Sequence, residues 1–209
     1  MGNVVFLNGE WLRRESAKIS VFDRGFMFGD AIYEVMAAYC GLIHEKDSHL
    51  DRLESSLDSV GMRLPFPRAK IERTLDESLQ RNKVSNALIY LQVSRGVQFP
   101  RNHKIEENID PTTLITVTER EIVDWENIDP LNLTTKDDFR WGRGDIKVTS
   151  LIANVMLRNE AVREGYDDAI LVRDEKVTEA TSANIFFVKG GIVTTPKKSS
   201  FFLHGITRQ

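Results

Sequence analysis

Cysteine, long apolar runs and an excess of charge of one sign are all lacking in this 209-residue sequence, and each shortage excludes a class of protein. The single cysteine, Cys40, cannot form an internal disulfide, which is typical of a reducing compartment and predicts a cytoplasmic protein. No uninterrupted apolar stretch approaches the roughly 20 residues that span a bilayer, so no membrane partner is expected. With 28 Lys and Arg residues against 31 Asp and Glu residues, the net charge is −3, and no basic stripe predicts a nucleic-acid partner.

Signatures of several common enzyme classes are also missing. The chain has no G-x-S-x-G, no Walker loop and no G-x-G-x-x-G, so a nucleophile-elbow hydrolase, an NTPase and a Rossmann domain all lack support. His44, Asp47 and His49 lie close together in the sequence, but no further residue with ligand spacing accompanies them. The sequence therefore predicts no metal site.

The patterns that are present predict an α+β fold. Turn residues between β-rich segments predict hairpins at 8–9, 41 and 190–191. Apolar residues at helical spacing predict helices over 48–60, from about 67 to the next strand, and over 150–164. The first of these helices is expected to open with Ser48 and Asp51 as a capping box. Because hairpins and helices are set apart rather than alternating as βαβ units, both halves are expected to be α+β.

A shift in composition divides the chain into two predicted domains. A charged segment at 119–124 is the expected linker between an N-terminal domain of residues 1–118 and a C-terminal domain of residues 125–209. Residues 96–111 form a charged, non-periodic stretch that is longer than an ordinary connection. Loops of this length are often functional.

Two charged residues in the second half could carry chemistry. In GDIKVTS, strand alternation places Ile146 and Val148 on one face and Lys147 on the other. Lys147 is then either a solvated strand lysine or an amine desolvated in a pocket, where it could form a Schiff base. Glu179, where a strand gives way to small polar residues, is either a turn carboxylate or a partner for a pyridinium nitrogen.

Two other places could bind a phosphate. Arg52 lies off the apolar stripe of its predicted helix, so its guanidinium is either exposed or available to clamp a phosphate. Gly205, Ile206 and Thr207 form a turn that could open a helix, whose free N–H groups favour an anion. In isolation, the same tripeptide is also typical of a loop.

The long loop contains a candidate carboxylate-binding pair. Arg101 and His103 have one residue between them, and alternate residues of an extended segment point to the same side. They are either solvated loop residues or a grip for a carboxylate. Tyr33 and Tyr90, on predicted strands, could contribute polar groups nearby.

Taken together, the motifs are far more specific than any one of them. From about residue 3 to residue 208 the chain contains, in this order, DRGFMFGDAIYEV, HLDRLESS, the Arg-Asn-His loop, RWGRGDIKVTSLIANV, EGYDDAILVRD, VTEATSANIFFV and GITR. In this combination the chain resembles the fold-type IV, class IV pyridoxal-phosphate aminotransferases. Among them it is most similar to the D-amino acid aminotransferases, whose carboxylate trap uses an Arg-x-His pair like that of Arg101 and His103.

The resemblance implies roles for the candidate residues. It implies that Lys147 forms the Schiff base with pyridoxal 5'-phosphate and that Glu179 is the partner of the pyridine nitrogen. It further implies that the Arg52 side chain holds the phosphate together with the backbone of Ile206 and Thr207. The C-terminal domain would then be the cofactor-binding domain.

The resemblance also implies a substrate site and a homodimer. The residues expected to line the substrate side are Tyr33, Tyr90, Arg101 and His103. In this family the loop pair is supplied by the neighbouring subunit, so a homodimer is expected. Relatives continue well past GITR, so the C-terminal domain is expected to be incomplete.

The implied reaction moves the amino group of a D-amino acid to a 2-oxo acid by a ping-pong mechanism. Two other activities on the same scaffold stay open, those of a branched-chain aminotransferase and of a 4-amino-4-deoxychorismate lyase. A third alternative is an inactive, truncated dimeric scaffold that holds no cofactor.

Overall fold

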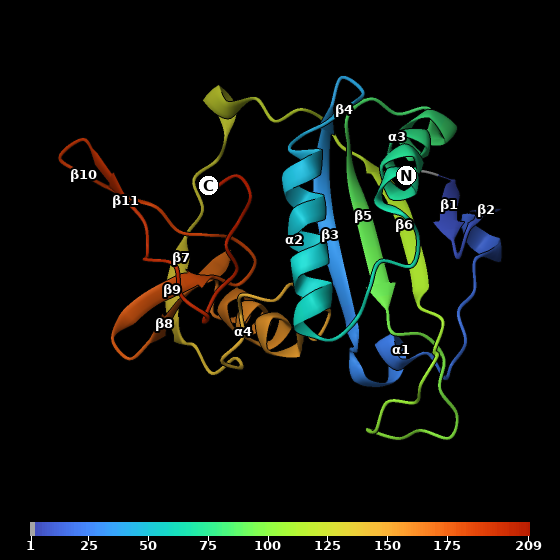
Figure 1. The fold of residues 1–209 in the computed structure, drawn as a ribbon. Coiled ribbons are helices and arrows are strands. Elements are labelled where there is room, and N and C mark those ends of the chain that lie inside the picture. Colours follow the sequence, from blue (N-terminus) through green and yellow to red (C-terminus); the bar gives the residue numbers. More distant parts are fainter. Residues whose placement is uncertain (1–2) are drawn as a thin grey trace. The chain divides into compact units, whose positions relative to one another are not determined.

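The computed structural model describes residues 3–209, and within it the chain forms two compact units (Figure 1). The first unit runs from the start of the described chain to Val123 and also includes Lys147–Ser150. The second unit comprises Asp124–Ile146 and Leu151–Gln209. Residues 147–150, which lie within the predicted C-terminal domain, are grouped with the first unit.

The first unit is built on an antiparallel six-stranded sheet with the strand order β2-β1-β6-β5-β3-β4. Its strands are β1 (Val4–Leu7), β2 (Glu10–Arg13), β3 (Ala31–Tyr39), β4 (Leu42–Ile43), β5 (Ala87–Ser94) and β6 (Thr112–Glu119). The predicted hairpins β1–β2 and β3–β4 are both confirmed. Each turns through a non-glycine residue and a glycine with positive φ, Asn8-Gly9 and Cys40-Gly41, which matches the twist of the flanking strands.

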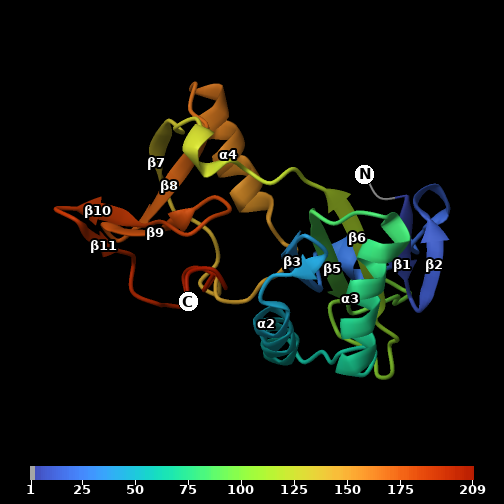
Figure 2. The same cartoon turned by 90° about the horizontal axis from the view of Figure 1, so that it is seen from above.

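Helices α2 (Lys46–Ser59) and α3 (Arg68–Asn82) cover one face of this sheet (Figure 2). Their leucine and isoleucine stripes are buried against it, as the helical spacing predicts. The expected capping box is wrong, because α2 begins at Lys46, ahead of Ser48. The Ser48 hydroxyl donates instead to the Glu45 carboxylate over 2.8 Å. Two short helices, η1 (Arg14–Ser16) and α1 (Arg24–Phe28), precede β3.

Strand alternation gives the sheet two chemically different faces. On β3 the residues Ile32, Glu34 and Met36 are buried, whereas Tyr33 between them is half-buried. On the paired strand β5, Tyr90 is likewise half-buried between buried neighbours. The buried set faces the helices, so polar side chains of the alternate set lie on the opposite face.

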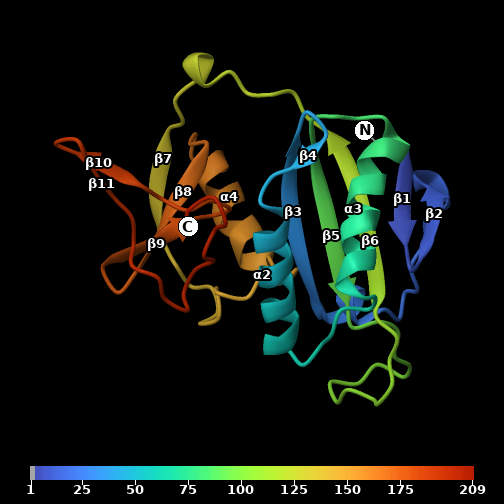
Figure 3. The same cartoon turned by 45° about the horizontal axis from the view of Figure 1, so that its top comes forward.

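The second unit contains a three-stranded sheet, one helix and a separate hairpin (Figure 3). Its elements are η2 (Trp125–Asn127), β7 (Leu133–Asp137), α4 (Ile152–Arg163), β8 (Asp168–Arg173), β9 (Lys176–Ala180), β10 (Phe187–Lys189) and β11 (Ile192–Thr194). The predicted β10–β11 hairpin at Gly190-Gly191 is confirmed. A small core of Leu157, Ala161, Ala169 and Leu171 joins α4 to β8.

One connection in the second unit differs from the sequence prediction. Strands β7 and β8 are parallel, and α4 lies between them in the sequence, so this unit contains a βαβ crossover where none was expected. The strand β7 alternates between exposed and half-buried residues and contains only one large apolar residue, Leu133. It therefore lacks the apolar run that marks a buried parallel strand.

Over residues 3–209, none of the helices combines the length and the apolar character needed to cross a bilayer.

Candidate active site

Lys147 is attached to the edge of β3 by backbone hydrogen bonds. The Tyr33 amide donates to the Lys147 carbonyl and the Thr149 amide donates to the Ala31 carbonyl, each over 3.0 Å. The strand expected around Lys147 is therefore reduced to a single antiparallel bridge between Ile32 and Val148. The side chain of Lys147 is half-buried, and its Nζ lies 4.3 Å from the centroid of the Tyr33 ring. This is a cation–π distance, so the amine is held at the aromatic face of Tyr33.

The two predicted tyrosines lie together on the sheet face that the helices leave uncovered. The rings of Tyr33 and Tyr90 stack with their centroids 5.6 Å apart. The Tyr90 hydroxyl donates to Gln92 Oε1 over 2.6 Å. Burial, with a smaller contribution from Tyr33, raises the pKa of Tyr90 to about 12. Tyr90 is therefore a neutral hydrogen-bonding group throughout the physiological range.

Arg52 extends from α2 to a fully buried carboxylate on β3. Its Nε and Nη2 donate to the two oxygens of Glu34, each over 2.7 Å, and His49 Nδ1 lies 2.7 Å from Glu34 Oε2. Burial tends to raise the pKa of Glu34, but hydrogen bonds from Arg52 and His49 outweigh it and hold this pKa below its ordinary range. Glu34 is thus ionised and fixes the orientation of the Arg52 guanidinium.

Sequence reasoning did not assign Glu34 a role. A signal for it exists, because Glu34 stands at an inward position of an alternating strand, where a charged residue requires a partner. The partner is not apparent from the sequence, since Arg52 lies 18 residues away on another element.

The predicted pair in the long loop meets on one aromatic ring. The guanidinium of Arg101 lies 4.1 Å from the centroid of Phe28, and the ring of His103 lies 5.3 Å from it. Both side chains are exposed. A buried arginine that sequence reasoning missed, Arg24, donates to the carbonyls of Asn102 and His103 and holds this part of the loop against α1.

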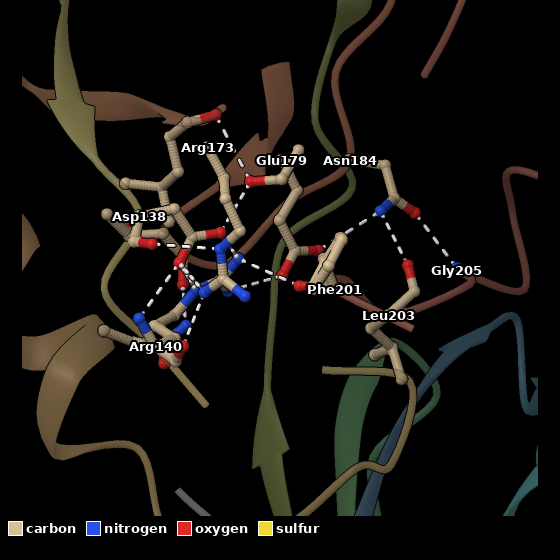
Figure 4. Close-up of polar contacts among 12 residues, drawn as sticks. Asp138, Arg140, Arg173, Glu179, Asn184, Phe201, Leu203 and Gly205 are labelled. Carbon is tan, nitrogen blue, oxygen red and sulfur yellow. Dashed lines mark hydrogen bonds and ion pairs between the residues drawn. The ribbon is translucent and has the colours of Figure 1, made fainter. Parts of the chain in front are cut away.

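In the second unit, Glu179 belongs to a buried network of alternating charges (Figure 4). Arg140 Nη1 donates to Glu179 Oε1 over 2.6 Å. The same guanidinium donates through Nε and Nη2 to the two oxygens of Asp138, each over 2.9 Å. Burial raises the pKa of Glu179 above its ordinary value, and Arg140 opposes that rise. For Asp138, burial acts the same way, but hydrogen bonds from Arg140 and Thr178 prevail and lower its pKa.

Asn184 connects Glu179 with the predicted phosphate-binding turn. Its Nδ2 donates to the Leu203 carbonyl over 2.8 Å and lies 3.4 Å from Glu179 Oε2, while its Oδ1 accepts the Gly205 amide over 3.0 Å. A Cβ at Gly205 would collide with Asn184 Oδ1, so glycine lets the Asn184 side chain keep this position. Beyond it, Ile206 is buried and Thr207 is exposed.

The segment after Gly205 is a turn. The Arg208 amide donates to the Gly205 carbonyl over 3.2 Å and the Gln209 amide to the Ile206 carbonyl over 3.1 Å. Gly205, Ile206 and Thr207 thus lie in a turn, as the sequence predicts.

The predicted site residues thus fall into two groups. The first unit holds those with basic or phenolic side chains, and the second unit holds the others. In the first unit these are Lys147, Arg52, Arg101, His103, Tyr33 and Tyr90, and in the second they are Glu179, Ile206 and Thr207. Within residues 3–209, no three His, Cys, Asp or Glu side chains gather in a way that could hold a metal ion.

Comparisons with known proteins agree on one family. Residues 31–209 match the family model for amino-transferase class IV. A D-alanine aminotransferase of Listeria monocytogenes serotype 1/2a (strain 10403S) is 34% identical over 207 residues, which cover 98% of this chain and 72% of that protein. A D-alanine aminotransferase of Staphylococcus haemolyticus is 36% identical over 208 residues, with 98% of this chain and 73% of that protein covered.

Solved structures give the same fold. The branched-chain amino acid aminotransferase of Escherichia coli superposes with a TM-score of 0.86 at 19% identity, covering 100% of this chain and 72% of that one. A branched-chain aminotransferase from the archaeon Thermoproteus uzoniensis, solved with norvaline, superposes with a TM-score of 0.83 at 22% identity, over 99% of this chain and 72% of the other. These matches confirm the fold class predicted from the sequence.

Proposed function

The chain belongs to the class IV aminotransferases, as the sequence resemblance predicted, and we propose that it moves the amino group of a D-amino acid to a 2-oxo acid. The observation that carries this proposal is the position of Lys147, whose amine is held against Tyr33 beside the buried Glu34–Arg52 pair. The D-alanine aminotransferases that match 98% of the chain support a D-amino acid as the donor.

We propose pyridoxal 5'-phosphate as the cofactor, because the chemistry of the donor set fits that group. Its aldehyde needs a primary amine, which Lys147 offers at a half-buried position. Its phosphate needs fixed donors, and the Arg52 guanidinium is oriented by two hydrogen bonds to Glu34. Its ring nitrogen needs a carboxylate, and Glu179 is buried with Arg140 as its counter-ion. When bound, this cofactor supplies an electron-withdrawing ring that stabilises negative charge at the Cα of the substrate.

The chain's own residues then divide the work of the reaction. Lys147 would hold the cofactor covalently. Once displaced, its Nζ would take the proton from Cα of the amino acid and pass it to the former aldehyde carbon of the cofactor, and in the second half-reaction it would carry a proton in the opposite direction. Glu179 would accept a hydrogen bond from the ring nitrogen. The backbone of Ile206 and Thr207 would share the phosphate with Arg52. These assignments rest on the matched motifs and on the local geometry of each unit.

Substrate binding would fall to the aromatic and basic residues of the first unit. Arg101 and His103 present two basic side chains from one loop, and a carboxylate can be held by such a pair. Tyr33 and Tyr90 would add hydroxyl groups to that site. We propose that the loop pair serves a second copy of the chain in a homodimer, which agrees with the exposure of both side chains. A reducing compartment such as the cytoplasm agrees with the single, exposed Cys40 thiol.

Covalent labelling tests this function directly. We expect the purified chain, mixed with pyridoxal 5'-phosphate, to develop a visible absorption band that borohydride abolishes, with the label on the Lys147 peptide. Lys147→Ala should lose the label and all turnover while its melting temperature stays near that of the wild type, because the change removes an amine and no core volume. A label distributed over surface lysines, or none, would contradict the proposal.

The donor amino acid is tested in the same preparation. The loaded wild-type chain should exchange D-alanine with 2-oxoglutarate and leave L-leucine unchanged. Exchange of L-leucine alone would instead assign the chain to branched-chain amino acids.

A further inference from the structure

We propose that Arg140 is a positioning residue for the cofactor: anchored on Asp138, it holds the Glu179 carboxylate ionised and oriented to accept a hydrogen bond from the protonated ring nitrogen. This inference rests on the proposed function, because it requires Glu179 to face the pyridine ring. It adds a residue that neither the sequence motifs nor the comparisons assign.

Arg140 is held more rigidly than an ordinary arginine. Its Nε and Nη2 form a bidentate pair with the two oxygens of Asp138, and its backbone amide donates to Asp138 Oδ1 over 3.1 Å. Asp138 is itself fully buried and accepts further hydrogen bonds from Thr178 and Arg173. Bidentate pairing fixes the plane of a guanidinium, so the remaining nitrogen, Nη1, has a defined direction.

That direction leads to Glu179. Nη1 donates to Glu179 Oε1 over 2.6 Å, a short distance typical of a charge-assisted hydrogen bond. The other oxygen, Oε2, lies 3.4 Å from Asn184 Nδ2, which is too far for a strong hydrogen bond. A carboxylate oxygen can accept about two hydrogen bonds, so Oε2 retains capacity for a ring N–H. Arg140 therefore fixes one oxygen and leaves the other able to accept.

The charge of Arg140 matters as much as its geometry. Glu179 is buried, and burial alone raises its pKa, which favours the neutral acid. A neutral carboxylic acid would not stabilise a positive charge on the ring nitrogen. Arg140 is the counter-ion that opposes this rise. A backbone hydrogen bond from Leu203 also lowers the pKa of Glu179, but the contribution of Arg140 is larger, so loss of Arg140 should remove most of what keeps Glu179 ionised.

A matched control lies in the same network. Arg173 also binds Asp138, through Nη2 over 3.1 Å and through Nε to its carbonyl, and it donates to the Arg140 carbonyl as well. These hydrogen bonds run to Asp138 and to the backbone, whereas the bond to Glu179 comes from Arg140. Arg173→Met therefore removes a guanidinium from Asp138 and keeps the Arg140–Glu179 contact, whereas Arg140→Met removes both. A difference between the two variants reports on Glu179 and not on general damage to the network.

The first experiment compares the binding of two cofactors by equilibrium dialysis. One is pyridoxal 5'-phosphate and the other is its analogue with CH in place of the ring nitrogen. We expect the wild type and Arg173→Met to prefer the natural cofactor by about tenfold or more, as for a charged hydrogen bond, and Arg140→Met to lose that preference. Arg140→Lys, which keeps the charge but cannot span both carboxylates, should keep part of it.

The outcomes separate the inference from the proposed function. If the wild type binds neither cofactor covalently, the proposed function fails and the inference fails with it. If the wild type shows the preference and Arg140→Met shows it equally, the inference alone is overturned. Should Arg140→Met not fold, Arg140→Lys compared with Arg173→Lys decides the matter, because only the former should lower the preference.

A second experiment needs no cofactor. The carboxyl carbon of Glu179, followed by NMR during a pH titration of the chain, reports its ionisation directly. Arg140→Met should move the titration of Glu179 upward, and Arg140→Lys should restore it most of the way. An equal upward move in Arg173→Met would show that Glu179 responds to the whole network, and would contradict the assignment to Arg140.

Discussion

Each unit has a carboxylate whose side chain is fully excluded from water, Glu34 in the first and Asp138 in the second, but the candidate site residues that these two acids position carry opposite charges. In the first unit, Glu34 contacts Arg52 directly, so the side chain one ion pair away from the buried acid is a cation. In the second, Asp138 contacts Arg140, which in turn contacts Glu179, so the side chain two ion pairs away is an anion. In both units the series of contacts begins with an acid whose side chain is fully excluded from water. A side chain one ion pair away from the buried acid is therefore positive, and a side chain two ion pairs away is negative.

The comparison shows how one kind of buried ion pair can position either a cation or an anion. A buried charge is tolerated only when it is paired, and an alternating chain of ions pairs every interior member. A side chain further along such a series is held in position by the ion pair with its neighbour. Arg52 is one ion pair away from its fully buried acid, and Glu179 is two ion pairs away. Removing the first link should therefore disturb the last one in each unit.

The largest expected effect comes from the first links themselves. Glu34→Gln and Asp138→Asn each replace a buried, ionised acid by a neutral amide, so the buried arginine beside it loses that counter-ion, and each should lower the free energy of unfolding by about 3–5 kcal/mol. Urea denaturation measures this. Asp51→Asn serves as the control, because Asp51 pairs with Arg68 at the exposed surface and should cost less than about 1 kcal/mol. A loss at Glu34 or Asp138 no larger than that of the control would contradict the comparison.

A smaller effect is expected at Arg101, which has no buried acid behind it. Arg101→Ala should raise KM for D-alanine by about tenfold or more, as for loss of a hydrogen bond to a charged group, with little change in kcat. Its guanidinium rests on Phe28 and is exposed, so the fold should not depend on it. Steady-state kinetics of this variant and of Lys104→Ala, an exposed neighbour in the same loop, provide the test. An equal KM in both variants would remove Arg101 from the site.

Smaller again is the effect expected at Tyr90, which is neutral and hydrogen-bonded within one strand. Tyr90→Phe removes the donor to Gln92 and should cost about 1 kcal/mol of unfolding free energy. Tyr39→Phe, at an exposed position of the neighbouring strand β3, should change it by less than about 0.5 kcal/mol. Thermal and urea unfolding distinguish the two. If the two variants were equally stable, the Tyr90–Gln92 hydrogen bond would have no net value.

How far the sequence predicts this molecule depends on how local each signal is. The hairpins at Asn8-Gly9 and Gly190-Gly191 follow from neighbouring residues, and both are present. The helix α3 follows from its apolar spacing after Pro67. The parallel strand β7 was missed because its partner β8 lies beyond α4, and its own residues alternate between exposed and half-buried without an apolar run. Non-local pairing of a short strand has no local signature.

The same limit applies to the candidate site. Lys147 and Glu179 are recognisable only because several motifs occur together. The residues that orient the candidates, Glu34 and Arg140, are not recognisable in this way, because their partners lie 18 and 39 residues away. An ion pair depends on three-dimensional proximity, and single-sequence spacing carries that only within one helix or strand. These two ion pairs are therefore visible only in the three-dimensional structure.

The smallest expected effect is a difference in how pH changes stability, and it has opposite signs for Glu34 and Glu179. The pKa of Glu34 is lowered on folding, so its stabilisation is present above its ordinary value of 4.5 and is lost as the pH falls further. The pKa of Glu179 is raised, so its penalty is present at neutral pH and is relieved as the pH falls towards 4.5. The test lowers the pH from about 7 to about 3 and measures the unfolding free energy of the wild type and of both variants. Between about pH 7 and 4.5, the wild type should gain stability relative to Glu179→Gln as the pH falls. Below about pH 4.5, the wild type should lose stability relative to Glu34→Gln. If the two stability differences changed with pH in the same direction, Glu34 and Glu179 would respond alike to their arginine partners. The contrast between the two units would then be wrong.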